Sequence, residues 1–272
     1  MTFSVVILTY NEEENISACL KSVEWADDVV VVDSFSTDQT CEIARKHGVR
    51  VFQRAFDDFG SQRNFAQNEV DLKYEWVFHL DADERFNEEL LLECNRVISE
   101  NLHSAWFVPN RIIFLGKWIK HCTQYPYPQV RLVKRGEVLF EKAGHGQREI
   151  GAKRGVGHIH VAYDHFNFSK GIDDWVARHN RYSSEEARLT AENNRQPLFE
   201  CFTRDAMKRN RALKSWFVRM PFRPTIKFLY LYFFLGGFLD GIPGWYYCRL
   251  QSMYEVMIVT KIKELEFTNS GK

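Results

Sequence analysis

Three acidic side chains, Asp81, Asp83 and Glu84, follow directly on a mostly apolar stretch at residues 76–80. The stretch has the composition of a strand buried on both faces, so the acids would lie where a strand of a sheet ends. Ligands of open α/β sheets collect at the carboxyl ends of strands, and carboxylates there suit a hard divalent cation that also holds substrate phosphates. The competing interpretation is that Asp81 and Asp83 only cap a helix that begins near Asn87.

Strands and helices alternate through the first hundred residues. Segments rich in apolar residues at 3–8, 28–33, 49–52 and 74–80 predict strands, and segments with apolar residues at helical spacing separate them. This order predicts an α/β fold with a mostly parallel central sheet flanked by helices.

Glycine-rich phosphate loops are missing after these strands, because neither G-x-G-x-x-G nor G-x-x-x-x-G-K-[ST] occurs there. A nucleotide bound at this sheet would therefore need side chains at strand ends, with a metal ion to neutralise its phosphates. That chemistry is typical of a nucleotide-sugar site.

The composition sets further bounds on the 272-residue chain. Lys+Arg and Asp+Glu are equal at 36 each, so the net charge predicts neither a nucleic-acid nor an acidic partner. The six cysteines show no C-x-x-C spacing, which favours a reducing, cytosolic setting. The first apolar run is too short for a signal peptide, and no stretch reaches the roughly 18 uninterrupted apolar residues of an ordinary transmembrane helix.

Four segments in this order resemble the inverting family 2 glycosyltransferases with the GT-A fold. Their order and spacing are most similar to the bacterial branch related to lipopolysaccharide-core glucosyltransferases. The segments are residues 6–13, 32–40, 62–64 and 80–84. Each motif alone is short and common, whereas four in the correct order are a specific signal.

The resemblance implies a role for each matching residue. Thr9, Tyr10 and Glu12 would surround the nucleoside, and Asp33 at the end of the second strand would contact the base. Glu12 also has a structural interpretation as an ordinary first-turn helix acid.

The same resemblance places further residues on the phosphates and the sugar. Arg63 would lie near the diphosphate or the sugar, Asp81 at the ribose of the donor, and Asp83 on a Mn²⁺ or Mg²⁺ ion. Arg63 has the alternative of being a solvated surface charge.

The middle of the chain is expected to hold the acceptor. Residues 129–134 and 138–141 flank Arg135-Gly136-Glu137 and are predicted to pair as a hairpin.

An inverting transfer needs a general base for the attacking hydroxyl. Two glycines permit a tight loop around residues 143–149, which leaves Glu149 and His145 as rival bases. The related branch often carries His-Glu here, and this chain has His145-Gly146; the structural alternative pairs Glu149 with Arg148 or Lys153.

Two further candidates come from residues 158–193. Histidines alternate with apolar residues at 158–165, as in an edge strand, and a strand ending at His165 would return its imidazole towards Asp83 as a second metal ligand. An amphipathic helix over residues 169–193 would bring Lys170, Arg178 and Arg181 to the diphosphate side. The Q-x-x-R-W motif of the processive synthases in this family is absent, so one sugar is expected per acceptor.

The C-terminal part has the composition of a membrane-surface segment. Residues 203–227 hold eight basic residues against the single acid Asp205, and aromatic residues are interleaved with them. Such a segment is attracted to an anionic bilayer at about 1 kcal/mol for each basic residue close to it. The apolar run at 228–239 is too short to span and predicts an interfacial or re-entrant helical hairpin. The alternatives are a helical pair packed on the catalytic domain or a homodimer interface; no nucleic-acid motif accompanies the basic residues.

Together these observations predict a GT-A catalytic domain at residues 1–195 and a helical, membrane-associating extension at 196–272. Residues 1–100 would form the nucleotide-sugar half and 101–195 the acceptor half. The predicted function is a metal-dependent hexosyltransferase that moves one sugar, from a UDP-sugar, to a lipid-linked glycan in bacterial lipopolysaccharide or surface-polysaccharide synthesis. It would act peripherally on the cytoplasmic face of the inner membrane. The alternatives are a polyprenyl-phosphate glycosyltransferase of the same fold and a non-catalytic membrane-bound scaffold.

Overall fold

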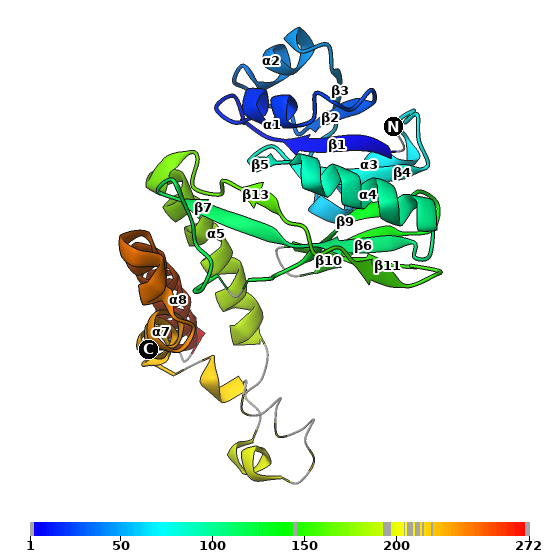
Figure 1. Ribbon diagram of the computed structural model, residues 1–272. Helices are drawn as coiled ribbons and strands as arrows, with labels where there is room; N and C mark the ends of the chain where they lie inside the picture. Colours follow the sequence, from blue (N-terminus) through cyan, green and yellow to red (C-terminus); the bar gives the residue numbers. More distant parts are fainter. Residues whose placement is uncertain are drawn as a thin grey trace. The chain divides into compact units, whose positions relative to one another are not determined.

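A computed structural model describes residues 3–123, 125–143, 146–192, 197–203, 205, 209, 213, 215–218 and 220–269. Its contacts divide the chain into two units (Figure 1). Unit 1 comprises Met1–Trp118 and Tyr125–Lys170, and unit 2 comprises Ile119–Gln124 and Gly171–Lys272. The domain boundary expected after residue 195 stays a prediction, since residues 193–196 lie outside the described part of the chain.

Unit 1 carries the strand–helix alternation. Its elements are β1 (Phe3–Thr9), α1 (Ile16–Ser22), β2 (Val29–Asp33), α2 (Thr40–Lys46), β3 (Arg50–Gln53), α3 (Phe59–Asn68), β4 (Trp76–Asp81), β5 (Glu84–Arg85), α4 (Glu88–Glu100), β6 (Ala105–Val108), β7 (Asn110–Phe114), β8 (Lys117–Trp118), β9 (Gln129–Lys134), β10 (Leu139–Ala143), β11 (Gly146–Ile150), β12 (Val156–His158) and β13 (Tyr163–His165).

The main sheet confirms the predicted mostly parallel α/β arrangement. Its strands lie in the order β12-β6-β9-β4-β1-β2-β3, and β3, β2, β1 and β4 run parallel, whereas β9 is antiparallel to both of its neighbours. In β1, Thr9 lies opposite Asp33 of β2 and Leu8 lies opposite Asp81 of β4. The register therefore brings the polar ends of the first, second and fourth strands to one edge of the sheet.

The core follows from strands buried on both faces. One cluster joins Val5, Ile7 and Phe78 to residues of α1, α2 and α4, and another joins Val6 and Val77 to residues of α3, β9 and β10. Because neighbouring side chains of a strand point to opposite faces, helices cover the sheet on both sides. This burial fixes the strands whose ends carry the candidate site.

The hairpin predicted around residues 135–137 is wrong. Strand β9 pairs with β4 and β6 inside the main sheet, and β10 pairs instead with β11 in a separate two-stranded sheet. Val138, directly before β10, is buried in the core cluster with α3, so the chain turns away from β9 at this point. Burial of an apolar side chain outweighed the local turn signal.

A third sheet returns the chain to the acids after β4. Its order is β5-β13-β7-β8, and β13 pairs antiparallel with β5, so that His165 lies opposite Glu84. The helix after these acids begins without their help, because the Asn87 side chain accepts the Leu90 N–H and caps α4 itself. The capping interpretation of Asp81 and Asp83 is therefore wrong.

Unit 2 is helical. Its elements are α5 (Gly171–Glu192), η1 (Leu198–Phe202), α7 (Arg223–Leu229), η2 (Tyr230–Phe234), η3 (Gly237–Asp240) and α8 (Gly241–Asn269). Ala187 of α5 packs with Ile258 and Ile262 of α8, and the Arg223 guanidinium lies 2.6 Å from the Glu255 carboxylate. Within the described residues no single helix is long and apolar enough to cross a membrane; residues 223–234 and 237–268 pass that test only as a pair bent by 68°.

Candidate functional site

The ends of β1 and β2 form a polar network around Asp33. The Asp33 carboxylate is fully buried and accepts hydrogen bonds from the Thr9 hydroxyl at 2.9 Å and the Ser36 amide at 2.8 Å, and from Gln53 Nε2 at 3.2 Å. Burial acts to raise the pKa of Asp33, but the hydrogen bonds from Ser36 and Thr9 outweigh it and hold the pKa below its ordinary value. A charged acceptor is thus fixed at the end of β2.

Two exposed aromatic side chains stand just beyond this pair of strand ends. Tyr10 is 58% exposed and Phe35 is 54% exposed. Phe35 has a φ of 60° and Asn11 a φ of 52°, a left-handed conformation that costs free energy in a residue other than glycine. The Asn11 side chain accepts the Thr37 N–H at 2.8 Å, which ties the loop after β1 to the loop after β2. Phe35 was missed from the sequence, although an aromatic residue inside a polar turn is a usable signal.

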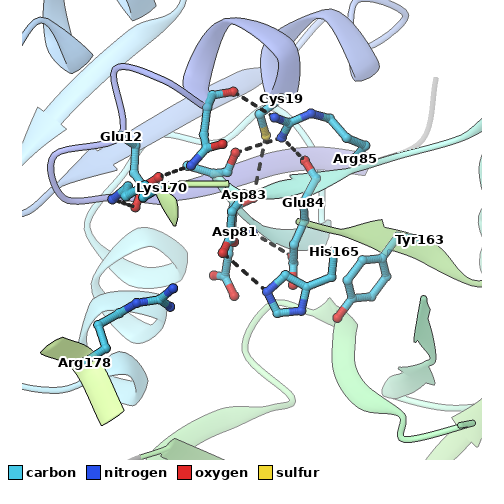
Figure 2. Close-up of polar contacts among 12 residues, drawn as sticks. Glu12, Cys19, Asp81, Asp83, Glu84, Arg85, Tyr163, His165, Lys170 and Arg178 are labelled. Atoms are coloured by element: carbon cyan, nitrogen blue, oxygen red, sulfur yellow. Dashed lines mark hydrogen bonds and ion pairs between the residues drawn. The ribbon is translucent and has the colours of Figure 1, made fainter. Parts of the chain in front are cut away.

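Glu12 lies in the same loop and is held by two partners (Figure 2). Its carboxylate pairs with Lys170 and accepts a hydrogen bond from Asn15 at 2.7 Å. Burial and the charge of Asp83 raise the pKa of Glu12, although Lys170 opposes them. Glu12 therefore lies within electrostatic reach of Asp83, and its expected contact with the nucleoside stays a prediction.

Asp81 is held by two arginines. Arg63 Nη2 and Arg131 Nη2 each lie 2.9 Å from a different oxygen of its carboxylate. The guanidinium of Arg63 is almost fully buried, so the alternative of a solvated surface charge is wrong. Burial acts to raise the pKa of Asp81, but the charges of Arg131 and Arg63 outweigh it and hold the pKa well below its ordinary value.

Arg131 is a residue of the site that none of the sequence motifs contains. It lies on β9, is 2% exposed, and also donates to Glu84 at 2.5 Å and to the Tyr163 hydroxyl at 3.0 Å. Burial, with the charge of Asp81, raises the pKa of Glu84 to about 7 although Arg131 opposes it. The buried Arg131 guanidinium therefore binds both the Asp81 and the Glu84 carboxylates. Glu84 takes up a proton more readily than Asp81 does.

Asp83 directly precedes β5, and its side chain lies beside His165 of the neighbouring strand β13. The His165 Nε2 lies 3.4 Å from the Asp83 carboxylate, and Figure 2 shows the carboxylate directed at the ring. Burial acts to lower the pKa of His165, but the charge and hydrogen bond of Asp83 outweigh it, so the pKa is raised. The two predicted metal ligands are thus brought together. In the described part of the chain no group of three or more His, Cys, Asp or Glu side chains is arranged to hold a metal ion.

A carboxylate and an imidazole fit part of a divalent-cation site. Asp83 and His165 are each about one-fifth exposed at the side chain, at 20% and 24%, so both remain accessible to a ligand. Phosphate oxygens and water complete the coordination of such ions at many nucleotide sites. These two residues suit an ion that arrives with a diphosphate better than an ion that the protein alone encloses.

One of the two candidate bases, Glu149, lies on β11. Glu149 is half-buried on β11, two residues from Gln147, and the two side chains share a face of the strand. Gln147 accepts a hydrogen bond from Arg63 Nε at 3.0 Å, which ties this sheet to Asp81. Arg148 pairs with Glu141. The other candidate, His145, lies outside the described residues.

Arg181, the last predicted site residue, lies on α5 in unit 2. Its contact with a diphosphate stays a prediction. Lys170, expected on the same helix, precedes α5 and belongs to unit 1, where it pairs with Glu12.

Comparison with known proteins gives these features a context. Residues 4–162, more than half of the chain, match the family model described as "Glycosyl transferase family 2". The chain is 25% identical over 271 residues to the lipopolysaccharide core biosynthesis glycosyltransferase LpsC of Rhizobium meliloti (strain 1021), covering 96% of this chain and 92% of that protein. It is also 26% identical over 258 residues to the uncharacterized glycosyltransferase RP128 of Rickettsia prowazekii (strain Madrid E), covering 88% of this chain and 81% of that one.

Among solved structures, the fold is similar to the mannosyltransferase PcManGT from Pyrobaculum calidifontis in complex with GDP-Man and Mn²⁺. The TM-score is 0.50 at 15% sequence identity, with 96% of this chain and 86% of that chain covered. At this identity the likeness concerns the fold, and it confirms the predicted GT-A arrangement.

Proposed function

Because the chain belongs to glycosyl transferase family 2, we propose that it transfers one sugar, with inversion, from a nucleotide sugar to a lipid-linked glycan. The observation that carries the proposal is the meeting of Asp33, Asp81 and Asp83 at one edge of a parallel sheet, with His165 beside Asp83. LpsC, which covers nearly the whole chain, supports an acceptor from lipopolysaccharide or surface-polysaccharide assembly. A UDP-sugar is the proposed donor.

The nucleoside end of the donor would lie on the ends of β1 and β2. The Asp33 carboxylate, kept charged by its hydrogen bonds, would accept an N–H of the base, and Tyr10 and Phe35 offer exposed ring faces for stacking. Asp81 would accept hydrogen bonds from the ribose while its arginine partners hold it in place. The Thr9 hydroxyl donates a hydrogen bond to Asp33, and Glu12 lies in the loop that follows β1.

Asp83 and His165 would hold a Mn²⁺ or Mg²⁺ ion that neutralises the charge of the leaving diphosphate. The acceptor hydroxyl oxygen forms a bond to the anomeric carbon as the bond from that carbon to the diphosphate oxygen breaks. The electron pair leaves with the diphosphate, and the hydroxyl proton passes to Glu149 or His145. Arg181 is the proposed further contact of the diphosphate, because a guanidinium binds phosphate with two parallel hydrogen bonds.

We also propose a peripheral location on the cytoplasmic face of a bacterial inner membrane, where a lipid-linked acceptor is within reach. The net positive charge of residues 203–227 supports attraction to an anionic surface.

The test is calorimetric titration of the full chain with UDP, GDP and CDP, each with and without Mn²⁺. We expect one nucleotide to bind in a Mn²⁺-dependent way, and Asp83→Ala to weaken it at least about tenfold, or about 1.4 kcal/mol. Asp71→Ala, which removes an exposed acid before β4, is the control and should bind as the unmodified chain does. Equal binding by Asp83→Ala would overturn the metal role of Asp83, and no binding of any nucleotide would overturn the proposal and favour a scaffold.

The choice between the bases is tested by Glu149→Gln and His145→Asn with the identified donor. The variant that lacks the base should lose about a hundredfold or more in kcat, with little change in donor binding. Equal and small losses in both variants would place the base elsewhere.

A further inference from the structure

Exposed apolar side chains gather where unit 2 bends. The bend comprises residues 226–246, from α7 through η2 and η3 to the first residues of α8, and is called the apolar bend below. Phe234 is 80% exposed and Ile242 is 71% exposed, and Phe233, Phe238, Leu239 and Tyr246 are each at least half exposed. A soluble protein leaves single apolar side chains in water, but a contiguous group marks a binding surface.

The bend is closely packed within itself. Gly236 has a φ of 77°, and a Cβ at Gly244 would lie 2.3 Å from the carbonyl oxygen of Gly237. A Cβ at Gly237 would in turn lie 2.9 Å from the sulfur of Cys248. Backbone segments therefore approach each other closely inside the bend, and the aromatic side chains are presented outwards on a fixed support.

The acidic residue of the apolar bend, Asp240, is buried. Between residues 206 and 254 the sequence has eight basic residues and one acid, Asp240. Asp240 is 2% exposed; its carboxylate accepts the amide hydrogens of Lys120 at 3.2 Å and His121 at 3.0 Å, and lies 2.8 Å from His121 Nδ1. The outer surface of the apolar bend thus presents no carboxylate among the described residues.

Cations and aromatic rings adjoin the exposed apolar side chains. The guanidinium of Arg249 lies 5.6 Å from the ring centre of Phe228 and 6.0 Å from that of Trp245. Trp245 is 40% exposed. Tryptophan and tyrosine beside a basic residue are typical of the level of lipid headgroups.

We infer that the apolar bend inserts into the interfacial layer of an anionic lipid bilayer, with Phe234 and Ile242 among the side chains that enter the acyl region. The positive charge of the flanking sequence and the buried position of Asp240 favour an anionic surface over an uncharged apolar partner. The inference deepens the proposed function and rests on it only for the acceptor, which a lipid-anchored glycan would present at that surface.

The test is co-sedimentation of the full chain with vesicles of phosphatidylcholine containing about 30% phosphatidylglycerol, compared with phosphatidylcholine alone. We expect binding to the anionic vesicles that weakens with added salt. Phe234→Ser combined with Ile242→Ser should weaken the partition coefficient about a hundredfold, since withdrawal of each large apolar side chain costs about tenfold.

Leu92→Ser combined with Leu102→Ser is the matched control, because these side chains are 66% and 63% exposed in unit 1. The control should bind vesicles as the unmodified chain does. Equal binding by Phe234→Ser/Ile242→Ser overturns the inference. A second result also overturns it: the unmodified chain does not bind vesicles and sediments as a dimer, and Phe234→Ser/Ile242→Ser sediments as a monomer. The bend would then contact a second copy of the chain. Vesicle binding needs no nucleotide, so this result is independent of the calorimetric test of the donor site.

Discussion

Replacing Arg131 by methionine should destabilise the protein more than any other single change at the candidate site. Methionine keeps most of the length of the arginine stem and removes the guanidinium. Arg131 and Glu84 are 2% and 0% exposed, and the guanidinium is shared between Glu84 at 2.5 Å and Asp81 at 2.9 Å. The two acids respond differently to its loss, since Asp81 keeps Arg63 as a partner.

The size of the loss follows from what remains around Glu84. In Arg131→Met the buried Glu84 carboxylate keeps the hydrogen bond from the Asp81 amide at 2.8 Å, but loses the cation that neutralised it. Removing one partner of a buried ion pair costs about 3–5 kcal/mol, because the other group must either stay charged without compensation or take up a proton. Against a total stability of about 5–15 kcal/mol, this is a large fraction.

Urea unfolding of Arg131→Met, Glu84→Gln and the double variant, followed by circular dichroism, measures this effect. If the stranded charge is the cause, the double variant should be more stable than the sum of the single losses predicts, with a coupling of about 2 kcal/mol or more. Arg148→Met is the control, because that arginine is 70% exposed on its partner Glu141 and should cost less than about 1 kcal/mol. Strictly additive losses, or a cost for Arg131→Met equal to that of Arg148→Met, would refute the reasoning.

Two further predictions concern unit 1. A carboxyl whose pKa is higher in the folded than in the unfolded chain binds protons preferentially when folded, so with a pKa of about 7 for Glu84 the free energy of unfolding should fall as the pH rises from about 5 to 7 in metal-free buffer. The fall from this group over these two pH units should be about 2 kcal/mol, since one pKa unit is worth about 1.4 kcal/mol and the group is only half ionised at pH 7. It should be smaller in Glu84→Gln, measured by urea unfolding at several pH values; a stability that rises over this range would contradict it. Gly157→Ala should destabilise by about 1–3 kcal/mol, because its Cβ would lie 2.4 Å from the Trp106 ring, and an unchanged unfolding midpoint in urea would show that the ring moves freely.

The parallel core strands were predictable because their burial is visible in the sequence. Residues 3–8, 28–33 and 76–80 are mostly apolar, which is typical of strands covered on both faces, and β1, β2 and β4 are found there. The same logic placed Asp33 and Asp81 at strand ends. The return of His165 to Asp83 was also expected, because histidines alternate with apolar residues at 158–165 as in an edge strand, and the two side chains are found 3.4 Å apart.

Strand partners were less predictable than strands. The turn chemistry of Arg135-Gly136-Glu137 favours a hairpin, and a local signal of this kind is worth only a few tenths of a kcal/mol to about 1 kcal/mol. Burial of Val138 and Phe140 against α3 is worth more, about 1.5–3 kcal/mol for each large apolar side chain, and it sends β10 to a different sheet. The strand partner therefore depends on whether burial against α3 outweighs the local turn preference. The residues of α3 lie far away in the sequence, so the local pattern around residues 135–137 does not reveal this.

Arg131 shows how a charged residue of a site is overlooked. Polar and apolar residues alternate in the first four positions of the segment 129–134. This pattern predicts a strand with one solvent-exposed face, on which Arg131 would lie. Strand β9 instead lies between β4 and β6, and its central residues are buried on both faces. The signal that does exist is one of charge balance: acids delivered by a buried strand require a buried cation, and an arginine flanked by Val130 and Leu132 is a good candidate to supply it. The search for a site at the end of a buried strand should therefore include the cations of other apolar strands as well as the acids of its own.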